Sequence, residues 1–198
     1  MKLQYPLILA SASPRRKHLL EQLGLEFRVQ PSHADEEIDE KTSPAEHVLV
    51  LAKRKAESIA EQETRSLILA ADTIVVLGDV ILNKPASEDE AYAMLSTLSG
   101  KMHEVYTGYA IWDPATGTAT ANYVRTEVWF RELGADEIRR YIATGSPMDK
   151  AGSYGIQDDY GAVFVERING DFYNVVGLPL CALYGSLKPY FLNGSAAK

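Results

Sequence analysis

The chain has 198 residues, 46% of them hydrophobic, and a formal net charge of -7 at pH 7. This composition supports a sizeable core, and we expect one domain over residues 1–192 followed by a disordered tail over residues 193–198. The negative charge argues against nucleic acid as a partner, and no apolar run approaches the ~18 residues of a membrane span. Cys181 is the only cysteine, so there is no internal disulfide and we expect a reducing, cytoplasmic location.

The first predicted elements are a buried strand over residues 7–10 and a helix that begins at Pro14. Ser13 suits the N-cap of this helix, and proline suits its first position. Arg15 and Arg16 then lie in the first turn, where the helix dipole disfavours cations. This conflict favours an anion held by backbone N–H groups, hydroxyls and guanidinium groups. The alternative is two solvated arginines on a surface helix.

Helical and strand-like segments alternate along the rest of the chain. Helices are expected over residues 44–62, between the capping box at Ser87 and Ser99, over 135–144 and after Pro179. Strands are expected over residues 67–77, 80–82, 103–112, 119–130, 161–168 and 171–176, the last two forming a hairpin around Asn169-Gly170. This mixture predicts an α/β protein with a mixed sheet.

Asp72 is the most informative polar residue, because it interrupts the apolar run over residues 67–77. A buried carboxylate without a partner is costly. In a cleft it could bind a divalent metal or accept a proton from water. The alternative is an aspartate at a strand end or bulge that accepts hydrogen bonds from nearby backbone.

Three further charged residues are candidates for a site. Lys55 shares the apolar face of the 44–62 helix, which suits an ammonium that reaches phosphate or a lysine that snorkels at the edge of the face. Lys84 follows the 80–82 strand and could lie close to Asp72, or it could be an ordinary solvated lysine. Glu36 lies in an acidic run; such runs are usually solvated, but one member could bind a metal.

Thr73 and Gln157 are neutral polar residues that suit recognition of a base edge. The segment over residues 152–157 could be a flexible loop that closes over a ligand, or an ordinary turn-rich connection. The chain has no G-x-x-x-x-G-K-[ST], G-x-G-x-x-G or G-x-S-x-G motif. This argues against P-loop hydrolysis, Rossmann cofactor binding and α/β-hydrolase chemistry.

Segments spread over nearly the entire chain resemble, in the same order, the signatures of the Maf family of nucleoside triphosphate pyrophosphatases. They are Leu9-Ala10-Ser11-Ala12-Ser13-Pro14-Arg15-Arg16, Glu36, residues 52–56, Ala71-Asp72-Thr73, Lys84-Pro85, Leu98-Ser99-Gly100, Asp149-Lys150-Ala151-Gly152, Tyr154-Gly155-Ile156-Gln157 and Val176-Gly177-Leu178-Pro179.

The resemblance implies a two-lobed, mixed-sheet α/β fold related to the inosine triphosphate pyrophosphatases, with the active site in the central cleft. It implies hydrolysis between the α and β phosphates of a nucleoside triphosphate, which yields the monophosphate and pyrophosphate. It also implies a divalent metal, Mg²⁺ or Mn²⁺, and a homodimer.

The same resemblance implies roles for individual side chains. Asp72 would accept a proton from water or bind the metal, and Glu36 would hold the metal or orient the water. The triphosphate would be held by Ser11, Arg16, Lys55 and Lys84.

The base would be selected by Arg15, Thr73 and Gln157, a combination that resembles the branch preferring dTTP and UTP, with modified pyrimidine nucleotides as further substrates. The alternatives are the 7-methyl-GTP-preferring branch and a non-catalytic nucleotide-sensing or cell-division regulatory module. The set of Asp72, Glu36, Lys55 and Lys84 favours catalysis, because a sensor would not need the carboxylates.

Overall fold

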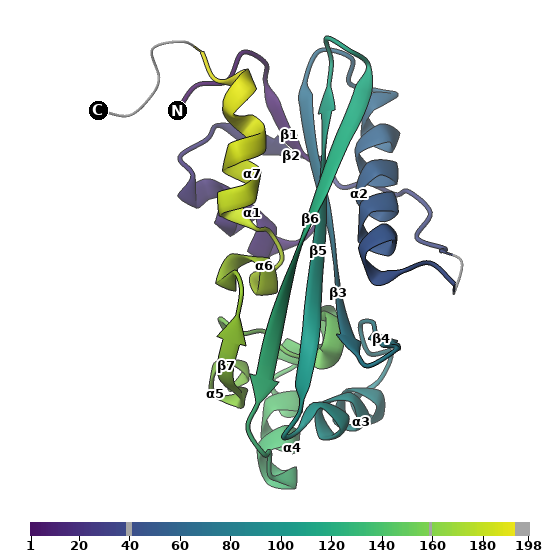
Figure 1. The fold of residues 1–198 in the computed structure, drawn as a ribbon, viewed down its shortest axis with the longest axis vertical. Helices are drawn as coiled ribbons and strands as arrows, with labels where there is room; N and C mark the ends of the chain where they lie inside the picture. The colour runs from purple at the N-terminus through teal and green to yellow at the C-terminus, as the bar shows by residue number, and fades with distance from the viewer. Residues whose placement is uncertain (39–40, 159, 193–198) are drawn as a thin grey trace. The chain divides into compact units, whose positions relative to one another are not determined.

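The computed structural model describes residues 1–38, 41–158 and 160–192 (Figure 1). The predicted tail over residues 193–198 lies outside the described residues. The helices and strands in chain order are β1 (Leu7–Leu9), α1 (Pro14–Gln22), β2 (Phe27–Val29), α2 (Pro44–Ala60), β3 (Leu67–Leu77), β4 (Val80–Leu82), α3 (Glu88–Leu98), β5 (Met102–Asp113), β6 (Thr118–Phe130), α4 (Ala135–Ala143), η1 (Ser146–Asp149), η2 (Ala151–Ser153), α5 (Gly161–Phe164), β7 (Val165–Asn169), α6 (Phe172–Val176), α7 (Leu180–Leu187) and η3 (Lys188–Tyr190).

The described strands form a seven-stranded sheet in the order β2-β1-β3-β5-β6-β7, with β4 paired to β3. Strand β1 is parallel to both of its neighbours, with Leu9 opposite Val29 of β2 and Leu69 of β3. Strands β4 and β7 pair antiparallel to β3 and β6. The predicted α/β class and mixed sheet are therefore confirmed.

The chain reverses direction across the sheet at β1. It passes outward from β1 through α1 to β2, then returns past β1 through α2 to β3. Such a reversal creates a topological switch point, and ligands of open α/β sheets bind outside the carboxyl ends of the strands there. The residues that follow Leu9 are therefore in a favourable place for a ligand.

Contacts along the chain divide it into two compact units. The first unit contains Met1–Asp72, Thr107–Val124 and the described part of Gly177–Lys198, and the second contains Thr73–Tyr106 and Arg125–Val176. Strands β3, β5 and β6 each contribute residues to both units. The single domain expected over residues 1–192 stays a prediction.

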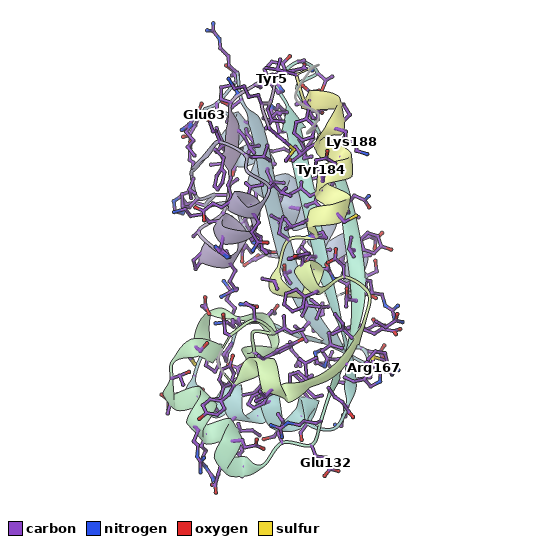
Figure 2. All side chains as sticks on the ribbon, turned by 90° about the vertical axis from the view of Figure 1, so that its left-hand side faces the viewer. Tyr5, Glu63, Glu132, Arg167, Tyr184 and Lys188 are labelled. Carbon is purple, nitrogen blue, oxygen red and sulfur yellow. The ribbon has the colours of Figure 1, made fainter. Side chains whose placement is uncertain are left out.

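In the first unit, α2 covers one face of the sheet, and α1 and α7 lie on the other (Figure 1). The interface between α2 and the sheet is a cluster of small and branched side chains from the helix and from the strands. The buried members of this cluster are Ile8, Ala10, Ala52, Ala56, Ile59, Ala60, Ile68, Ala70 and Ala110. Gly108 allows close approach, because a Cβ atom there would lie 2.5 Å from the Val48 carbonyl oxygen. At the end of α7, Lys188 Nζ lies 5.6 Å from the ring centroid of Tyr184 (Figure 2).

The second unit has an aromatic core. The rings of His103, Phe130 and Tyr154 make edge contacts with centroid separations of 4.7–5.3 Å. Phe164 extends this cluster to Tyr141 of α4. Helix α3 packs against α4 in the same unit. No helix among the described residues is long and apolar enough to cross a bilayer.

Most predicted elements are confirmed within a few residues, but the hairpin around Asn169-Gly170 is wrong. Residues 161–164 form α5, β7 ends at Asn169, and the segment after Gly170 is helix α6. The Asp171 carboxylate explains the helix, because its Oδ1 accepts hydrogen bonds from the backbone N–H groups of Tyr173 (2.7 Å) and Asn174 (3.3 Å). An aspartate in this position caps a helix rather than leading a strand.

Candidate functional site

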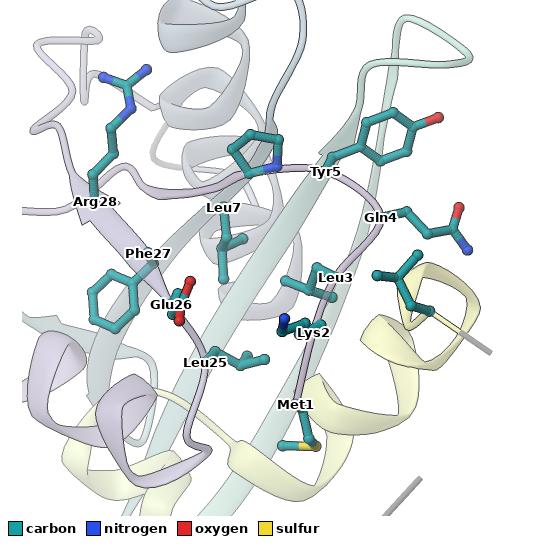
Figure 3. A pocket seen from close by; sticks show the side chains of 12 residues that line it. Met1, Lys2, Leu3, Gln4, Tyr5, Leu7, Leu25, Glu26, Phe27 and Arg28 are labelled. Carbon is teal, nitrogen blue, oxygen red and sulfur yellow. The ribbon is translucent and has the colours of Figure 1, made fainter. Parts of the chain in front are cut away.

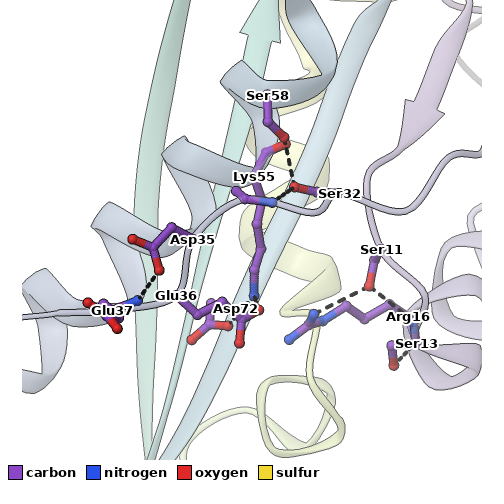
Figure 4. A network of polar contacts seen from close by, with 11 residues as sticks. Ser11, Ser13, Arg16, Ser32, Asp35, Glu36, Glu37, Lys55, Ser58 and Asp72 are labelled. Atoms are coloured by element: carbon purple, nitrogen blue, oxygen red, sulfur yellow. Dashed lines mark hydrogen bonds and ion pairs between the residues drawn. The ribbon is translucent and has the colours of Figure 1, made fainter.

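A lysine held between two carboxylates forms the centre of the site in the first unit. Lys55 Nζ donates a hydrogen bond to Asp72 Oδ1 at 2.7 Å and pairs with Glu36 Oε1 at 2.7 Å. The side chains of Lys55 and Asp72 are only 12% and 13% exposed, whereas that of Glu36 is 64% exposed. Three residues chosen from sequence therefore come together around one ammonium (Figure 4).

The periodicities of α2 and β3 explain why Lys55 meets Asp72. Ile68 and Ala70 of β3 pack in the cluster under α2, and Asp72 continues their alternation on the same face of the strand. Lys55 lies on α2 next to Ala52, which belongs to that cluster. The strand therefore presents its carboxylate to the helix face that carries the ammonium. This arrangement replaces the alternative of an aspartate bonded only to nearby backbone.

Glu36 lies in an irregular segment that α2 holds in place. The hydroxyl groups of Ser32 and Ser58 are 2.7 Å apart, and Arg54 Nη1 donates to the Glu37 carbonyl oxygen at 2.6 Å. Both Arg54 and Ser58 belong to α2, which also carries Lys55. The acidic run is thus tethered on both sides of Glu36 to the helix that provides the ammonium.

The turn after β1 places the Ser11 hydroxyl and the Arg16 guanidinium in contact, in the same unit as Lys55 and Asp72. Ala10 N donates to Leu69 O at 2.7 Å, so the parallel register with β3 continues past the end of β1. Ser11 is buried, and its Oγ accepts hydrogen bonds from Ser13 N (3.2 Å) and Arg16 Nη1 (3.4 Å). The predicted N-cap is also present, since Ser13 Oγ accepts from Arg16 N at 3.4 Å.

Arg16 lies in the electrostatic field of the carboxylates. Burial lowers the pKa of its guanidinium, the charges of Asp72 and Glu36 oppose this shift, and the charge of the adjacent Arg15 reinforces it. Arg16 Nε also donates to the carbonyl oxygen of Gly177 at 2.9 Å. Figure 4 shows the guanidinium directed toward the side of the site where Asp72 lies. The first unit therefore gathers cations and carboxylates of the kind that hold a phosphorylated ligand.

Arg15 lies in the first turn of α1, within the first unit, and the other three candidates belong to the second unit. Thr73 is partly buried in β3, directly after Asp72. Lys84 is exposed in the connection that follows β4, and Gln157 is exposed after η2. Their roles stay predictions.

The segment over residues 152–157 is packed, which differs from the flexible loop considered above. Residues 152–156 are buried, and only Gln157 is exposed. The Tyr154 hydroxyl lies 2.8 Å from His103 Nε2, and Gly155 N donates to the Tyr141 hydroxyl at 3.1 Å. Lys150, itself buried, donates to Ser146 O at 2.5 Å. Gln157 therefore follows a backbone that internal hydrogen bonds hold in place.

No group of three or more His, Cys, Asp or Glu residues suited to a metal ion occurs among the described residues. Glu36 and Asp72 nevertheless converge on one position of positive charge, since each has an oxygen 2.7 Å from Lys55 Nζ. Protein-bound Mg²⁺ commonly uses one or two carboxylates and takes its other oxygens from substrate phosphates and water. These two carboxylates fit that pattern.

A separate pocket of about 600 Å³ opens in the first unit (Figure 3). Its lining comes from residues 1–7, residues 25–28 and Leu192. It adjoins the amino ends of β1 and β2, whereas Ser11 follows the carboxyl end of β1. The candidate site residues thus lie outside this pocket.

Some residues that support the site were not singled out from sequence. Ser58 is three positions after Lys55, and this helical spacing is a signal that the two share a face. Arg54 and Ser32 act through backbone and hydroxyl contacts between segments that are distant in sequence. Gly177 appeared only within a family signature, whereas the structure shows its carbonyl oxygen on Arg16.

Comparison with known proteins identifies the family. A family model described as "Maf-like protein" matches residues 6–190. A dTTP/UTP pyrophosphatase from Geobacillus sp. (strain WCH70) is 53% identical over 92% of this chain and 96% of its own length. Another from Desulforamulus reducens is 49% identical over 93% of this chain and 96% of its own, and one from Bacillus cereus (strain B4264) is 50% identical over 93% and 95%. The chain therefore belongs to the Maf family.

Proposed function

We propose that this protein is a dTTP/UTP pyrophosphatase. It adds water across the α–β anhydride of dTTP or UTP and releases the nucleoside monophosphate and pyrophosphate. The observation that carries the proposal is the Lys55 ammonium held between Asp72 and Glu36, with Arg16 close enough for both carboxylates to affect its pKa. The names of relatives at about half identity support the choice of substrate.

Asp72 is the residue we assign to proton transfer. Hydrolysis requires water to lose a proton as its oxygen attacks phosphorus, and a carboxylate held by an ammonium is oriented for that task. Lys55 fixes Asp72 through the 2.7 Å hydrogen bond. Ser11, Arg16, Lys55 and Lys84 hold the triphosphate and stabilise the negative charge that develops on the departing pyrophosphate.

Asp72 and Glu36 are also the residues that would hold a divalent cation, Mg²⁺ or Mn²⁺. The cation would share these two carboxylates with the substrate phosphates. When bound, it supplies positive charge that offsets the charge of the triphosphate. Lys55 would then keep both carboxylates in place, because it already contacts an oxygen of each.

We assign base selection to Arg15, Thr73 and Gln157. Uracil and thymine present both a donor and acceptors on one edge, and the amide of Gln157 offers both kinds of group. The packed backbone of residues 152–156 supports this role, since it fixes the point from which the Gln157 side chain extends. The same residues would accept a modified pyrimidine that keeps this edge.

The assembly and location of the protein belong to the same proposal. A homodimer is expected by resemblance, and sedimentation equilibrium would show whether the mass exceeds the 21.8 kDa of one chain. A cytoplasmic location is consistent with a single cysteine, which is exposed on α7. Nucleic acid and membranes are not among the expected partners, given the net charge of -7.

One assay tests the proposed function. The purified chain is incubated with dTTP, UTP, other canonical triphosphates and 7-methyl-GTP, with Mg²⁺ or Mn²⁺, and pyrophosphate and phosphate are measured separately. We expect pyrophosphate from dTTP and UTP, and none with the Asp72→Asn variant, which controls for contaminating enzymes. Release from 7-methyl-GTP alone would assign the other branch, and no release from any triphosphate would favour a binding module.

A further inference from the structure

The side chain of Arg16 is fixed by a residue far along the chain. Its Nε donates to the Gly177 carbonyl oxygen at 2.9 Å, and its Nη1 donates to Ser11 Oγ at 3.4 Å. The first bond joins residues 161 positions apart. A guanidinium is planar, so a partner at Nε restricts rotation of the whole group about the side-chain axis. The direction of its terminal nitrogens therefore depends on where the Gly177 carbonyl points.

The backbone at Gly177 has a conformation that other residues rarely adopt. Its φ is +123°, which lies in the region that a Cβ atom makes unfavourable. The following residue, Leu178, is fully buried, and Pro179 then caps α7. The chain after Gly177 is thus anchored, and the glycine conformation sets the orientation of the carbonyl that faces Arg16.

The Gly177 carbonyl oxygen also partly offsets the unfavourable placement of cations in the first turn of α1. Arg15 and Arg16 lie where the helix dipole disfavours cations, and the first turn contains no acidic residue. A carbonyl oxygen on Nε offsets part of this cost with a neutral acceptor, in addition to the charges of Asp72 and Glu36 that act on the same guanidinium. Gly177 can thus help to hold the arginine in place without neutralising its charge.

We infer that Gly177 is a positioning residue for catalysis: its left-handed backbone aims the Arg16 guanidinium at the triphosphate. This inference rests on the proposed function, in which Arg16 contacts phosphate. The backbone just before α7 thereby affects how well Arg16 stabilises the phosphates. In this inference Gly177 is not a catalytic residue, and its effect passes through the 2.9 Å bond to Nε.

A double-mutant cycle between Gly177→Ala and Arg16→Ala tests the inference. The added methyl group disfavours the positive φ, so the peptide rotates and the carbonyl leaves Nε. We expect kcat/KM for dTTP to fall by about 10- to 100-fold, the scale reported for a misplaced catalytic group. Inhibition by inorganic pyrophosphate should weaken in parallel. In the Arg16→Ala background, the same glycine substitution should change kcat/KM by less than about twofold, because the partner is gone.

Gly24→Ala is the matched control. Gly24 also has a positive φ, +63°, and a Cβ atom there would meet nothing within 4 Å. It follows α1 but has no contact with the Arg16 side chain among those described for it. We expect the backbone strain of Gly24→Ala to lower the thermal midpoint, as in Gly177→Ala, while kcat/KM and the inhibition by pyrophosphate stay unchanged.

The outcomes separate the inference from the proposed function. A wild-type chain that releases no pyrophosphate contradicts the function. If the wild type is active, two results overturn the inference alone. One is a Gly177→Ala variant with unchanged kcat/KM, and the other is a loss of kcat/KM from Gly177→Ala that is equally large in the Arg16→Ala background. Should Gly177→Ala fail to fold by circular dichroism, the cycle is run with Gly177→Asn, because asparagine tolerates a positive φ of about +57° and the peptide must still rotate away from +123°. The same two results then decide.

Discussion

Lys55 and Asp72 are joined by a 2.7 Å hydrogen bond between side chains that are almost fully covered. Few ammonium and carboxylate groups are buried unless they are paired. Glu36 adds a second carboxylate to the same nitrogen from the exposed side. Lys55 therefore contacts one buried carboxylate, that of Asp72, and one exposed carboxylate, that of Glu36. Substitutions of these two residues should have different effects.

Asp72→Asn should abolish most turnover while the fold persists. The amide keeps the shape of the side chain and can still accept a hydrogen bond from Lys55, but it cannot take a proton from water. We expect kcat for dTTP to fall by ~10²–10⁴-fold, the usual contribution of a general base. Initial rates of pyrophosphate release measure the loss. Glu63→Gln is the control, since Glu63 pairs with Arg28 away from Lys55; near-normal turnover of Asp72→Asn would remove Asp72 from its role.

Lys55→Ala and Lys84→Ala should lose similar activity but differ in stability. Each removal of a phosphate-stabilising cation should lower kcat by ~10²–10³-fold. Lys55→Ala also leaves Asp72 buried without its ammonium, so its thermal midpoint should fall, whereas exposed Lys84 should have no such effect. Differential scanning fluorimetry compares the midpoints, with Lys53→Ala on the exposed side of α2 as control. Equal midpoints for the two site variants would contradict a structural role for the Lys55 ion pair.

Glu36→Gln and Glu37→Gln test which member of the acidic run belongs to the site. Glu36 pairs with Lys55 Nζ, whereas the Glu37 contacts described here involve its backbone, with Arg54 and with Asp35. We expect Glu36→Gln to raise the Mg²⁺ concentration that gives half-maximal rate, and Glu37→Gln to leave it unchanged. Rates measured over a Mg²⁺ titration give both values. The reverse order would assign the metal to the neighbouring carboxylate.

Local signals in the sequence were sufficient for most of the fold. Ser43 and Glu46 form the full capping box that their spacing predicts, with Ser43 N donating to Glu46 Oε2 at 3.3 Å and Glu46 N to Ser43 Oγ at 3.4 Å. At the capping box predicted at Ser87, Ser87 Oγ does accept from Glu90 N, but the Glu90 carboxylate accepts from Ala86 N at 2.7 Å. Caps depend on residues three or four positions apart, so a sequence pattern can identify them.

The errors arise where distant residues decide the local structure. Asn169-Gly170 is a strong hairpin signal, yet Thr126 Oγ1 of β6 accepts a hydrogen bond from Asp171 N at 3.0 Å. That contact, with the capping role of Asp171, directs the chain into α6. The Asp171 cap is a local signal that competes with the hairpin signal, whereas no pattern within residues 161–176 contains the Thr126 contact.

Two residues of the candidate site, Asp72 and Lys55, could be identified from local sequence patterns, but their grouping with Glu36 could not. The interrupted apolar run identified Asp72, and helical spacing placed Lys55 on the covered face of α2. Spacing could not show that both Asp72 and Glu36 contact Lys55, because this depends on how α2 packs over β3 and on the tether from Ser58. Family resemblance supplied the association, and the structure supplies the contacts.

Gly108→Ala should destabilise the first unit. The new Cβ atom would lie 2.5 Å from the Val48 carbonyl oxygen, so α2 or β5 must shift. Overpacking of this kind costs about 1–3 kcal/mol, and urea denaturation should show that loss in the free energy of unfolding. Gly185→Ala in α7 is the control, because nothing lies within 4 Å of its Cβ position and alanine favours a helix. Equal stability of Gly108→Ala and wild type would mean that α2 does not approach β5 so closely.

His103 should make stability depend on pH in the acidic range. Burial lowers its pKa from 6.5 to about 4, so the unfolded chain binds more protons between these values. As pH falls from 6.5 toward 4, the free energy of unfolding should drop by up to about 3 kcal/mol from this group, while above 6.5 it adds no slope. His103→Gln keeps a partner for the Tyr154 hydroxyl but cannot titrate, so urea denaturation between pH 4.5 and 7.5 should give a flatter profile than wild type. Exposed His33→Gln should leave the profile unchanged, and parallel profiles for wild type and His103→Gln would show that His103 is not held neutral by burial.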